Sequence, residues 1–310
     1  MKKLLSLLLA MAMLLACTVV SAEDTAIEVT DMTDRTVTLD TPATRIVAIT
    51  AANVEVLYAL GAGDTLVGRG EYCDYPTEAL DVPSVKSGSE LNVEEIVALT
   101  PDVVIMDTMS QTTEQVEALE NAGIKVVMTK EDGIEGVYTA IELIGKVVGK
   151  NDEADALVED MKSTFDEVKA AAADADFAGK TVYFEISPLQ WGLWTGGNGT
   201  FMDEIADMLG LTNIFADVDG WASVSEEQVL ERNPDYIVTT SSYYGEGPTP
   251  VEEIEQREGW SNVTAVANGN IFNADSDAFT RPGPRLADAA KSLLEFLTNS
   301  TAEEEAAPAA

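Results

Sequence analysis

The sequence predicts an α/β protein in which two lobes, each with a mostly parallel sheet, are joined by a long rigid helical segment. Three observations predict this architecture. Short apolar strands alternate with amphipathic helices in both halves of the chain. Between the halves, residues 133–176 carry apolar side chains at helical spacing with charges between them. A short pattern also recurs at a constant offset of 133 residues, as from Glu94 to Glu227.

The first lobe is predicted over residues 29–132. The apolar run at 45–49 is typical of a short buried strand, and 53–61 places its apolar residues on one side of a helix that ends at a glycine. Two further apolar runs, at 103–106 and 124–128, predict strands on either side of another helix. This alternation favours a parallel sheet with helices on both faces.

The middle of the chain, 133–176, is rich in alanine and glutamate and predicts one or two long helices. One more surface helix of a single domain is the alternative interpretation. A strand at 181–186 begins a second βα series, so the second lobe is predicted over 177–298. Residues 299–310 contain a run of glutamates and predict an acidic disordered tail.

The repeated pattern runs through a cap, an acidic turn, a helix, a Pro-Asp pair and a strand: Glu94, Pro101, Asp102 and Ile105 recur as Glu227, Pro234, Asp235 and Val238. Asn92 and Ser225 are the predicted N-caps. Glu94 and Glu227 therefore take the same place in two equivalent helices. Their carboxylates could simply complement the helix dipoles. They could also form a symmetric pair of exposed groups for a basic partner surface, and both interpretations stay open.

Composition excludes several classes of function. The 310 residues include 46% hydrophobic and 24% charged residues, which is ordinary for a globular protein. Eighteen basic residues against 55 acidic ones give a net charge of −37, which argues against nucleic acid and anionic membrane surfaces as partners. The chain has no histidine, which excludes Ser-His-Asp triads, Cys-His dyads and His-ligated metal sites.

The N-terminus has the order of a secretory signal over residues 1–22: lysines, an apolar run at 4–15, and small residues at 20–22. A helix over that run would span only about 18 Å, against about 30 Å for the core of a bilayer. Two cleavage sites compete. The segment ending at Cys17 resembles a lipobox, which would lipidate that cysteine, whereas 20–22 suits an ordinary signal peptidase. Cys73 is the only other cysteine, so no intramolecular disulfide is expected.

Loop aromatics and arginines are the candidate ligand-binding residues. Arg281 and Arg285 bracket a loop stiffened by two prolines, which could hold Arg281 against an anionic ligand. An ion pair with a neighbouring acid is the alternative. Trp191 precedes a Gly-rich turn, Tyr72 follows a short strand, and Trp221 precedes the second copy of the repeat. Together such aromatics suit a large flat ligand, although any single one is more often a packing residue.

Several motifs resemble the extracytoplasmic solute-binding proteins of the iron-siderophore and vitamin B12 class. They follow the family order over residues 29–298 and comprise 29–35, 37–39, 45–47, 57–61, 72–76, Asn92-Val93-Glu94, Pro101-Asp102, Asn233-Pro234-Asp235 and 281–285. The resemblance implies the class III periplasmic-binding-protein fold, in which two Rossmann-like lobes are joined by one rigid helix. It also implies that the ligand is held in the cleft between the lobes.

The resemblance implies partners as well. Proteins of this family deliver their ligand to an ABC importer, whose transmembrane subunits present arginines to one glutamate on each lobe. Glu94 and Glu227 match those glutamates, which favours the docking interpretation. A monomer is expected, in contact with the membrane only through the lipid that Cys17 could carry. Binding is expected to close the lobes only slightly, because one long helix allows less hinge motion than flexible strands.

The resemblance implies a ligand site too. In the B12-binding members, aromatic residues equivalent to Tyr72 and Trp221, and an Asp and an Arg matching Asp277 and Arg281, face the corrinoid. Ala278 stands where those members carry a bulky aromatic residue.

A ferric siderophore, anionic in many forms, would use Arg281 and Arg69 as counter-charges. Haem and bare metal ions are disfavoured without histidine. The sequence therefore predicts an iron- or cobalt-containing organic chelate as the ligand, with no cofactor and no protein metal site.

The function predicted from the sequence is the substrate-binding component of an ABC importer, outside the cytoplasm and without enzymatic activity. Two other classes fit the composition. An exported glycoside hydrolase could work with paired carboxylates and no histidine, although no spacing singles out one pair. A cell-surface adhesin or sensor would need neither a cleft arginine nor docking glutamates.

Overall fold

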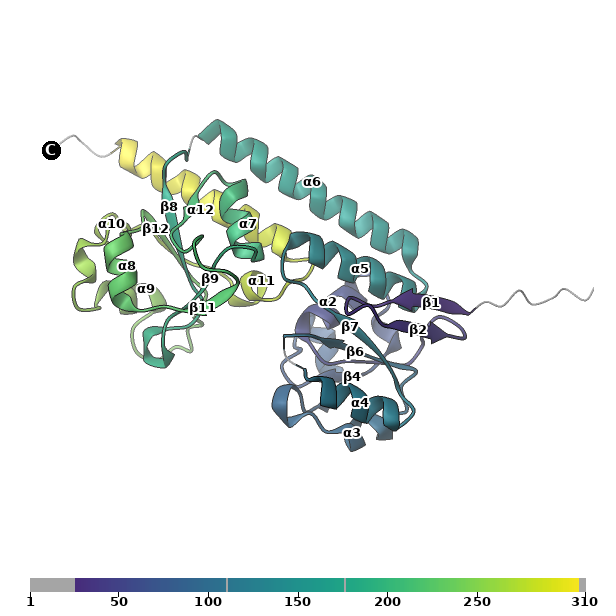
Figure 1. Ribbon diagram of the computed structural model, residues 1–310. Helices are drawn as coiled ribbons and strands as arrows, with labels where there is room; N and C mark the ends of the chain where they lie inside the picture. The colour runs from purple at the N-terminus through teal and green to yellow at the C-terminus, as the bar shows by residue number, and fades with distance from the viewer. Residues whose placement is uncertain (1–25, 110, 176, 307–310) are drawn as a thin grey trace, which may run out of the picture.

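The structure is a computed structural model that describes residues 26–109, 111–175 and 177–306. Two α/β lobes stand side by side, and the long helix α6 (Asn151–Ala175) runs along both of them (Figure 1). The predicted signal, residues 1–22 with Cys17, lies outside the described residues. None of the described helices combines the length and the apolar composition that a membrane span requires.

The N-terminal lobe contains a parallel five-stranded sheet in the order β5-β4-β3-β6-β7. Its strands are β3 (Ile46–Ala48), β4 (Leu66–Gly70), β5 (Ser84–Val85), β6 (Val103–Asp107) and β7 (Lys125–Thr129). The covering helices are α2 (Ala51–Ala59), α3 (Val93–Ala98), α4 (Thr113–Asn121) and α5 (Ile134–Val148). An antiparallel hairpin of β1 (Ile27–Thr30) and β2 (Thr36–Leu39) precedes the sheet.

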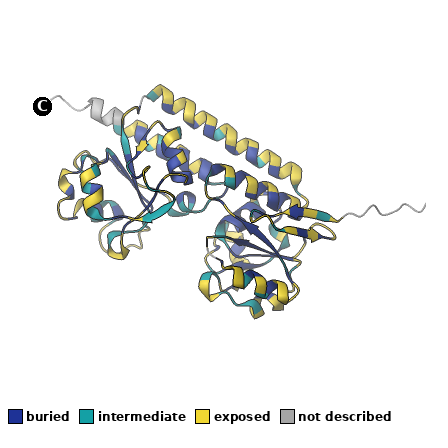
Figure 2. Cartoon of the chain, viewed as in Figure 1, coloured by how far each residue is buried: buried dark blue, intermediate teal, exposed yellow. Residues whose placement is uncertain are grey.

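The central strand β3 is wholly apolar, and β6 and β7 each carry a run of apolar residues, because helices cover both faces of the sheet. Ile46 packs in a core cluster with Leu57 of α2 and Ile141 of α5. Val47, the next residue, points to the opposite face and packs in a second cluster with Ile96 of α3. Figure 2 shows the resulting buried sheet between helices whose outer faces are exposed.

The C-terminal lobe repeats this plan with a parallel four-stranded sheet in the order β10-β8-β12-β13. Its strands are β8 (Thr181–Glu185), β10 (Thr212–Asn213), β12 (Tyr236–Thr239) and β13 (Ile271–Asn273), and a separate antiparallel ribbon pairs β9 (Trp194–Gly196) with β11 (Trp221–Ser223). The helices are α7 (Phe201–Met208), α8 (Glu226–Arg232), α9 (Pro250–Glu255), α10 (Thr264–Ala267), α11 (Ser276–Thr280) and α12 (Leu286–Ala306).

The predicted helical segment 133–176 divides at Gly149, which ends α5 in a left-handed conformation with φ 70°. Helix α5 packs inside the N-terminal lobe, and α6 runs on to the C-terminal lobe. It contacts α5 of the N-terminal lobe and α7 and α12 of the C-terminal lobe. Its buried stripe has the helical spacing read from the sequence: Ala154, Val158, Met161, Phe165, Val168 and Ala172.

The sequence predicted a disordered tail over 299–310, and this prediction is wrong for residues 299–306. Helix α12 continues through them to Ala306. Between Leu286 and Ala306 the sequence has no glycine or proline to end a helix, and alanine and glutamate are strong helix formers. A run of glutamates is typical of a solvated tail. Here it follows turns of α12 that are already formed, so the helix only has to be extended and not nucleated.

Candidate functional site

Each lobe has a pocket at the same topological position. In the N-terminal sheet the strand order reverses between β3 and β6, and in the C-terminal sheet it reverses between β8 and β12. Parallel α/β sheets bind ligands at the carboxyl ends of the strands beside such a switch point. Both pockets lie at the carboxyl edges of their sheets: most residues that line the N-lobe pocket follow β3, β4 and β5, and most of those that line the C-lobe pocket follow β8 and β12.

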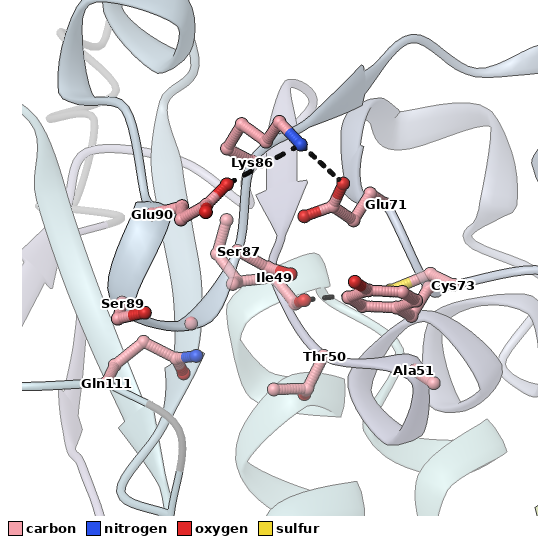
Figure 3. Close-up of a pocket in the computed structure, with 12 residues that line it drawn as sticks. Ile49, Thr50, Ala51, Glu71, Cys73, Lys86, Ser87, Ser89, Glu90 and Gln111 are labelled. Atoms are coloured by element: carbon pink, nitrogen blue, oxygen red, sulfur yellow. Dashed lines mark hydrogen bonds and ion pairs between the residues drawn. The ribbon is translucent and has the colours of Figure 1, made fainter.

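The N-lobe pocket has a volume of about 510 Å³ and a mainly polar wall (Figure 3). It is lined by Ile49, Thr50, Ala51, Glu71, Tyr72, Cys73, Lys86, Ser87, Gly88, Ser89, Glu90 and Gln111. Lys86 lies between two carboxylates, with its Nζ 2.9 Å from Glu71 and 3.7 Å from Glu90. The hydrogen bond to Glu71 raises the pKa of Lys86, so its charge is fixed and already paired.

Tyr72 is the large exposed aromatic of this pocket, with 75% of its surface accessible. The neighbouring thiol, Cys73, is buried, and burial raises its pKa to about 12. Cys73 is therefore a protonated wall residue and not a reactive thiolate. The ring of Tyr72 and the polar rim are therefore the accessible groups of the N-lobe pocket.

The C-lobe pocket has a volume of about 550 Å³ and is rich in aromatic and proline residues. It is lined by Ile186, Ser187, Pro188, Gln190, Trp191, Thr240, Ser241, Ser242, Tyr243, Tyr244, Glu246, Pro248, Pro250, Glu253 and Ser276. Trp191 is 74% exposed and Tyr244 is 85% exposed. Exposed rings on a pocket wall offer flat surfaces for stacking.

Sequence reasoning missed Tyr243 and Tyr244. The signal was present, because both residues come soon after the apolar run of β12 and stand in a loop with two glycines and one proline before α9. A loop at the carboxyl end of a parallel strand belongs to the binding edge of the sheet.

An ion cluster joins the two lobes between the pockets. Glu55 of α2 accepts hydrogen bonds from Arg285 at 2.8 and 2.7 Å and from Arg281 at 3.3 Å. Arg281 also contacts Asp74 at 2.8 Å and Asp277 at 2.9 Å. We call these five residues the interlobe ion cluster.

The interlobe ion cluster connects a segment beside one pocket with a segment beside the other. Asp74 directly follows Cys73 of the N-lobe pocket, and Asp277 directly follows Ser276 of the C-lobe pocket. Both carboxylates meet at the guanidinium of Arg281. The cluster therefore lies between the two pockets, at the contact of the lobes.

The predicted role of Arg281 as a free grip for an anion does not match this geometry. Its side chain is 15% exposed and three carboxylates surround it. The alternative that the sequence left open, an ion pair with a nearby acid, is what the structure shows. Arg69 does not face the cleft either, because it is buried and donates to the carbonyl oxygens of Ala79, Gly70 and Glu71.

Trp221 lies outside both pockets. It belongs to the β9–β11 ribbon and packs on Phe201, with ring centroids 5.1 Å apart. Gly196, its partner in the ribbon, leaves room for the indole, since a Cβ there would come within 2.9 Å of the ring. The structure thus places Tyr72 in the N-lobe pocket and Trp191 in the C-lobe pocket, puts Asp277 and Arg281 in the interlobe ion cluster, and leaves Trp221 as a packing residue of the ribbon.

Glu94 and Glu227 occupy equivalent places, as the repeat predicts. Asn92 caps α3, and its Oδ1 accepts from the backbone N–H of Glu94 at 3.0 Å. Ser225 caps α8 in a reciprocal capping box with Gln228. Because each helix leads into a parallel strand of its sheet, each N-terminus lies at the carboxyl edge, on the side of the pockets. Both glutamates are exposed, and neither forms an ion pair within the described part of the chain.

Comparison with known proteins identifies the family. The sequence profile of the periplasmic binding proteins matches residues 46–278. The chain belongs to this family. An uncharacterized ABC transporter substrate-binding lipoprotein of Bacillus subtilis (strain 168), YvrC, is 33% identical over 90% of this chain and 87% of its own length. The resemblance inferred from the sequence motifs is confirmed.

Two further relatives extend the match. A vitamin B12-binding protein of Salmonella choleraesuis (strain SC-B67) is 31% identical over 83% of this chain and 91% of its own. The crystal structure of an ABC-type Fe3+-hydroxamate transport system from Saccharomonospora viridis DSM 43017 is 26% identical, with a TM-score of 0.71, and covers 87% of this chain and 98% of its own. The class III periplasmic-binding-protein fold is confirmed.

Family membership decides between the functions that the sequence left open. The protein is an extracytoplasmic substrate-binding component of an ABC importer, works with transmembrane permease subunits, and is not an enzyme. The comparisons give no support to a glycoside hydrolase, an adhesin or a sensor.

Proposed function

We propose that this periplasmic binding protein captures a metal chelate, a corrinoid or a ferric hydroxamate, between its two lobes. The observation that carries the proposal is the pair of pockets on one cleft with an exposed ring on each wall, Tyr72 in the N-lobe and Trp191 in the C-lobe. Two stacking surfaces suit a large ligand with flat or apolar faces. The names of the relatives, for vitamin B12 and for Fe3+-hydroxamate, agree with this ligand class.

In this proposal, Tyr72 and Trp191 contact the ligand from opposite sides, with Tyr243 and Tyr244 extending the C-lobe surface. Asp277 and Arg281 border it at the floor of the cleft. The protein itself supplies no metal ligand, and the iron or cobalt stays in its organic chelator.

Glu94 and Glu227 dock the loaded protein on the permease. Both are exposed and lie on the pocket side of equivalent helices, and the pKa of Glu227 is lowered by its own backbone N–H and by Ser225. Cys17 anchors the protein by a lipid, in line with the lipoprotein name of the Bacillus subtilis relative. The anchored protein acts as a monomer.

A thermal-shift screen followed by calorimetry tests the ligand class. Cyanocobalamin, dicyanocobinamide, ferrichrome and ferrioxamine B are each added to the purified protein. A specific chelate is expected to raise the melting temperature through mass action and to bind with a stoichiometry of one. A flat response to all four chelates would overturn the proposed function.

A further inference from the structure

We propose that Glu55 makes the cleft select against anionic chelates, by neutralising Arg281 and Arg285 at its floor. The inference rests on the proposed function and adds the charge of the ligand to it. Glu55 is a buried carboxylate on the N-lobe helix α2, and both arginines come from the loop between α11 and α12 of the other lobe. No motif of the sequence marks Glu55.

The carboxylate of Glu55 accepts hydrogen bonds from both arginines. Its side chain is only 3% exposed, and Arg285 binds it in a two-pronged manner through Nε and Nη2. The guanidinium of Arg285 also stacks on the ring of Tyr75 at 4.0 Å, which fixes its plane. Arg281 adds a third hydrogen bond to the same carboxylate. A charged, bidentate arrangement of this kind is among the strongest polar contacts in proteins.

The charge of the interlobe ion cluster is negative. Asp74 and Asp277 join Glu55 around Arg281, so three carboxylates stand against two guanidinium groups and leave one net negative charge. Asp74 and Asp277 are the two exposed members, since their side chains are 54% and 42% accessible. A ligand at the cleft floor therefore meets carboxylates first.

The rest of the cleft offers no compensating cation. Among the described residues that line the two pockets, Lys86 is the one cationic side chain, and Glu71 and Glu90 already pair with it. The remaining described arginines are committed elsewhere: Arg35 to Asp31, Arg45 and Arg69 to backbone carbonyls, Arg232 to Asp217, and Arg257 to Glu185 and Glu253.

Binding a trianionic chelate here would remove its hydration without supplying a counter-charge, which is costly. A neutral or cationic chelate avoids that cost. The cleft is thus suited to corrinoids and ferric hydroxamates and unsuited to ferric tris-catecholates. Glu55 sets the sign of this charge, because without it two carboxylates would stand against two guanidinium groups and the interlobe ion cluster would no longer be negative.

The test measures dissociation constants for the wild type and for Glu55→Gln with four probes: neutral cyanocobalamin, neutral ferrichrome, monocationic ferrioxamine B and trianionic ferric enterobactin. We expect the wild type to bind a neutral or cationic probe and to reject the trianion. Glu55→Gln is expected to tighten binding of the trianion by about tenfold or more. Asp155→Asn, which makes the same charge change on the exposed face of α6, is the matched control. It should leave the ratios between the dissociation constants of the four probes unchanged.

A second variant covers the case in which Glu55→Gln does not fold. Asp74→Asn with Asp277→Asn leaves the buried Glu55 in place and frees Arg281 from two half-exposed partners. This double variant should also tighten the binding of ferric enterobactin relative to the neutral probes. Loss of binding that is equal for all probes would indicate a merely structural role for these carboxylates and would overturn the inference.

The failure of the inference and the failure of the proposed function are distinguishable. A wild type that binds ferric enterobactin as tightly as the neutral probes overturns the charge selectivity but leaves chelate capture intact. Variants that gain no affinity for the trianion overturn it as well. A wild type that binds no neutral or cationic probe contradicts the proposed function itself.

Discussion

The two pockets share one topological position and differ in chemistry. The N-lobe pocket is polar, with a lysine held between two glutamates, whereas the C-lobe pocket carries Trp191, Tyr243 and Tyr244 among prolines. Both lie beside the strand-order switch of a parallel sheet. The difference shows that topology determines where a ligand binds in this fold, while the loops after each strand determine what is bound.

Glu94 and Glu227, the proposed docking residues, occupy equivalent places in the two lobes, whereas the pockets differ, and replacing both residues tests that contrast. Glu94→Ala with Glu227→Ala should reduce chelate uptake by about a hundredfold or more, because two exposed charges that steer and hold the partner are lost together. Ligand affinity should stay unchanged, since neither residue lines a pocket. Uptake of labelled chelate into cells and calorimetry on the purified variant measure the two effects. A fall in affinity would contradict the docking role.

The buried carboxylates of the two lobes provide the next comparison. Glu185 of β8 relies on Arg257, with bonds of 2.6 and 2.9 Å, whereas Glu55 has two arginine partners. Arg257→Met should lower the free energy of unfolding by about 3–5 kcal/mol, because it leaves a buried charge without its arginine. Arg285→Met should cost less, since Arg281 still contacts Glu55. Urea denaturation of both variants checks the order, and equal losses would show that the second arginine does not compensate.

The N-lobe also contains a buried acid with no arginine partner. Burial raises the pKa of Glu131 well above its ordinary value, and the neighbouring Asp107 adds to the shift. With its pKa raised in the folded state, Glu131 stabilises the fold only while it is protonated. This contribution to the free energy of unfolding is lost as the pH rises above the ordinary pKa range of glutamate. Glu131→Gln should therefore gain stability relative to the wild type as the pH rises from about 4 to 8.

Urea denaturation over that pH range measures the difference for Glu131→Gln, with Glu135→Gln, an exposed neighbour on α5, as the control. A difference between Glu131→Gln and the wild type that is independent of pH would show that Glu131 titrates normally in the folded protein.

Substitutions of Tyr244 and Lys86 should change ligand affinity least, and they compare the aromatic C-lobe pocket with the polar N-lobe pocket. Tyr244→Ala should weaken chelate binding by about fivefold, because an exposed stacking surface is removed. Lys86→Met should change the affinity for a neutral chelate by less than about twofold, since its charge is exposed and already paired. Titration calorimetry distinguishes them. A larger effect of Lys86→Met would assign ligand recognition to the polar pocket instead.

Local features of this fold were predictable because local chemistry determines them. The buried strands, the cap at Asn92 and the capping box at Ser225 follow from short-range patterns. The aspartate of the repeated Pro-Asp pair has the same structural role in both lobes. Asp102 accepts from the backbone N–H groups of Thr44 and Arg45, and Asp235 accepts from that of Thr181, so each aspartate holds the start of the neighbouring strand.

The site was less predictable because it depends on contacts between distant segments. Glu55 and Arg281 are 226 residues apart in the chain, and nothing near either residue indicates the other. The sequence singled out Arg281, but its pairing depends on acids that only the folded lobes bring to it. Tyr243 and Tyr244 were missed for a different reason, because their loop was not assigned to the binding edge.

The central claim is that one ligand contacts both lobes, and a double-mutant cycle across the cleft tests it most directly. Dissociation constants are measured for the wild type, Tyr72→Ala, Trp191→Ala and the double variant, with the tightest chelate of the screen. We predict that each single substitution weakens binding by about tenfold and that the double variant weakens it by about a hundredfold. Full affinity in either single variant would place the ligand on one lobe alone and contradict the account.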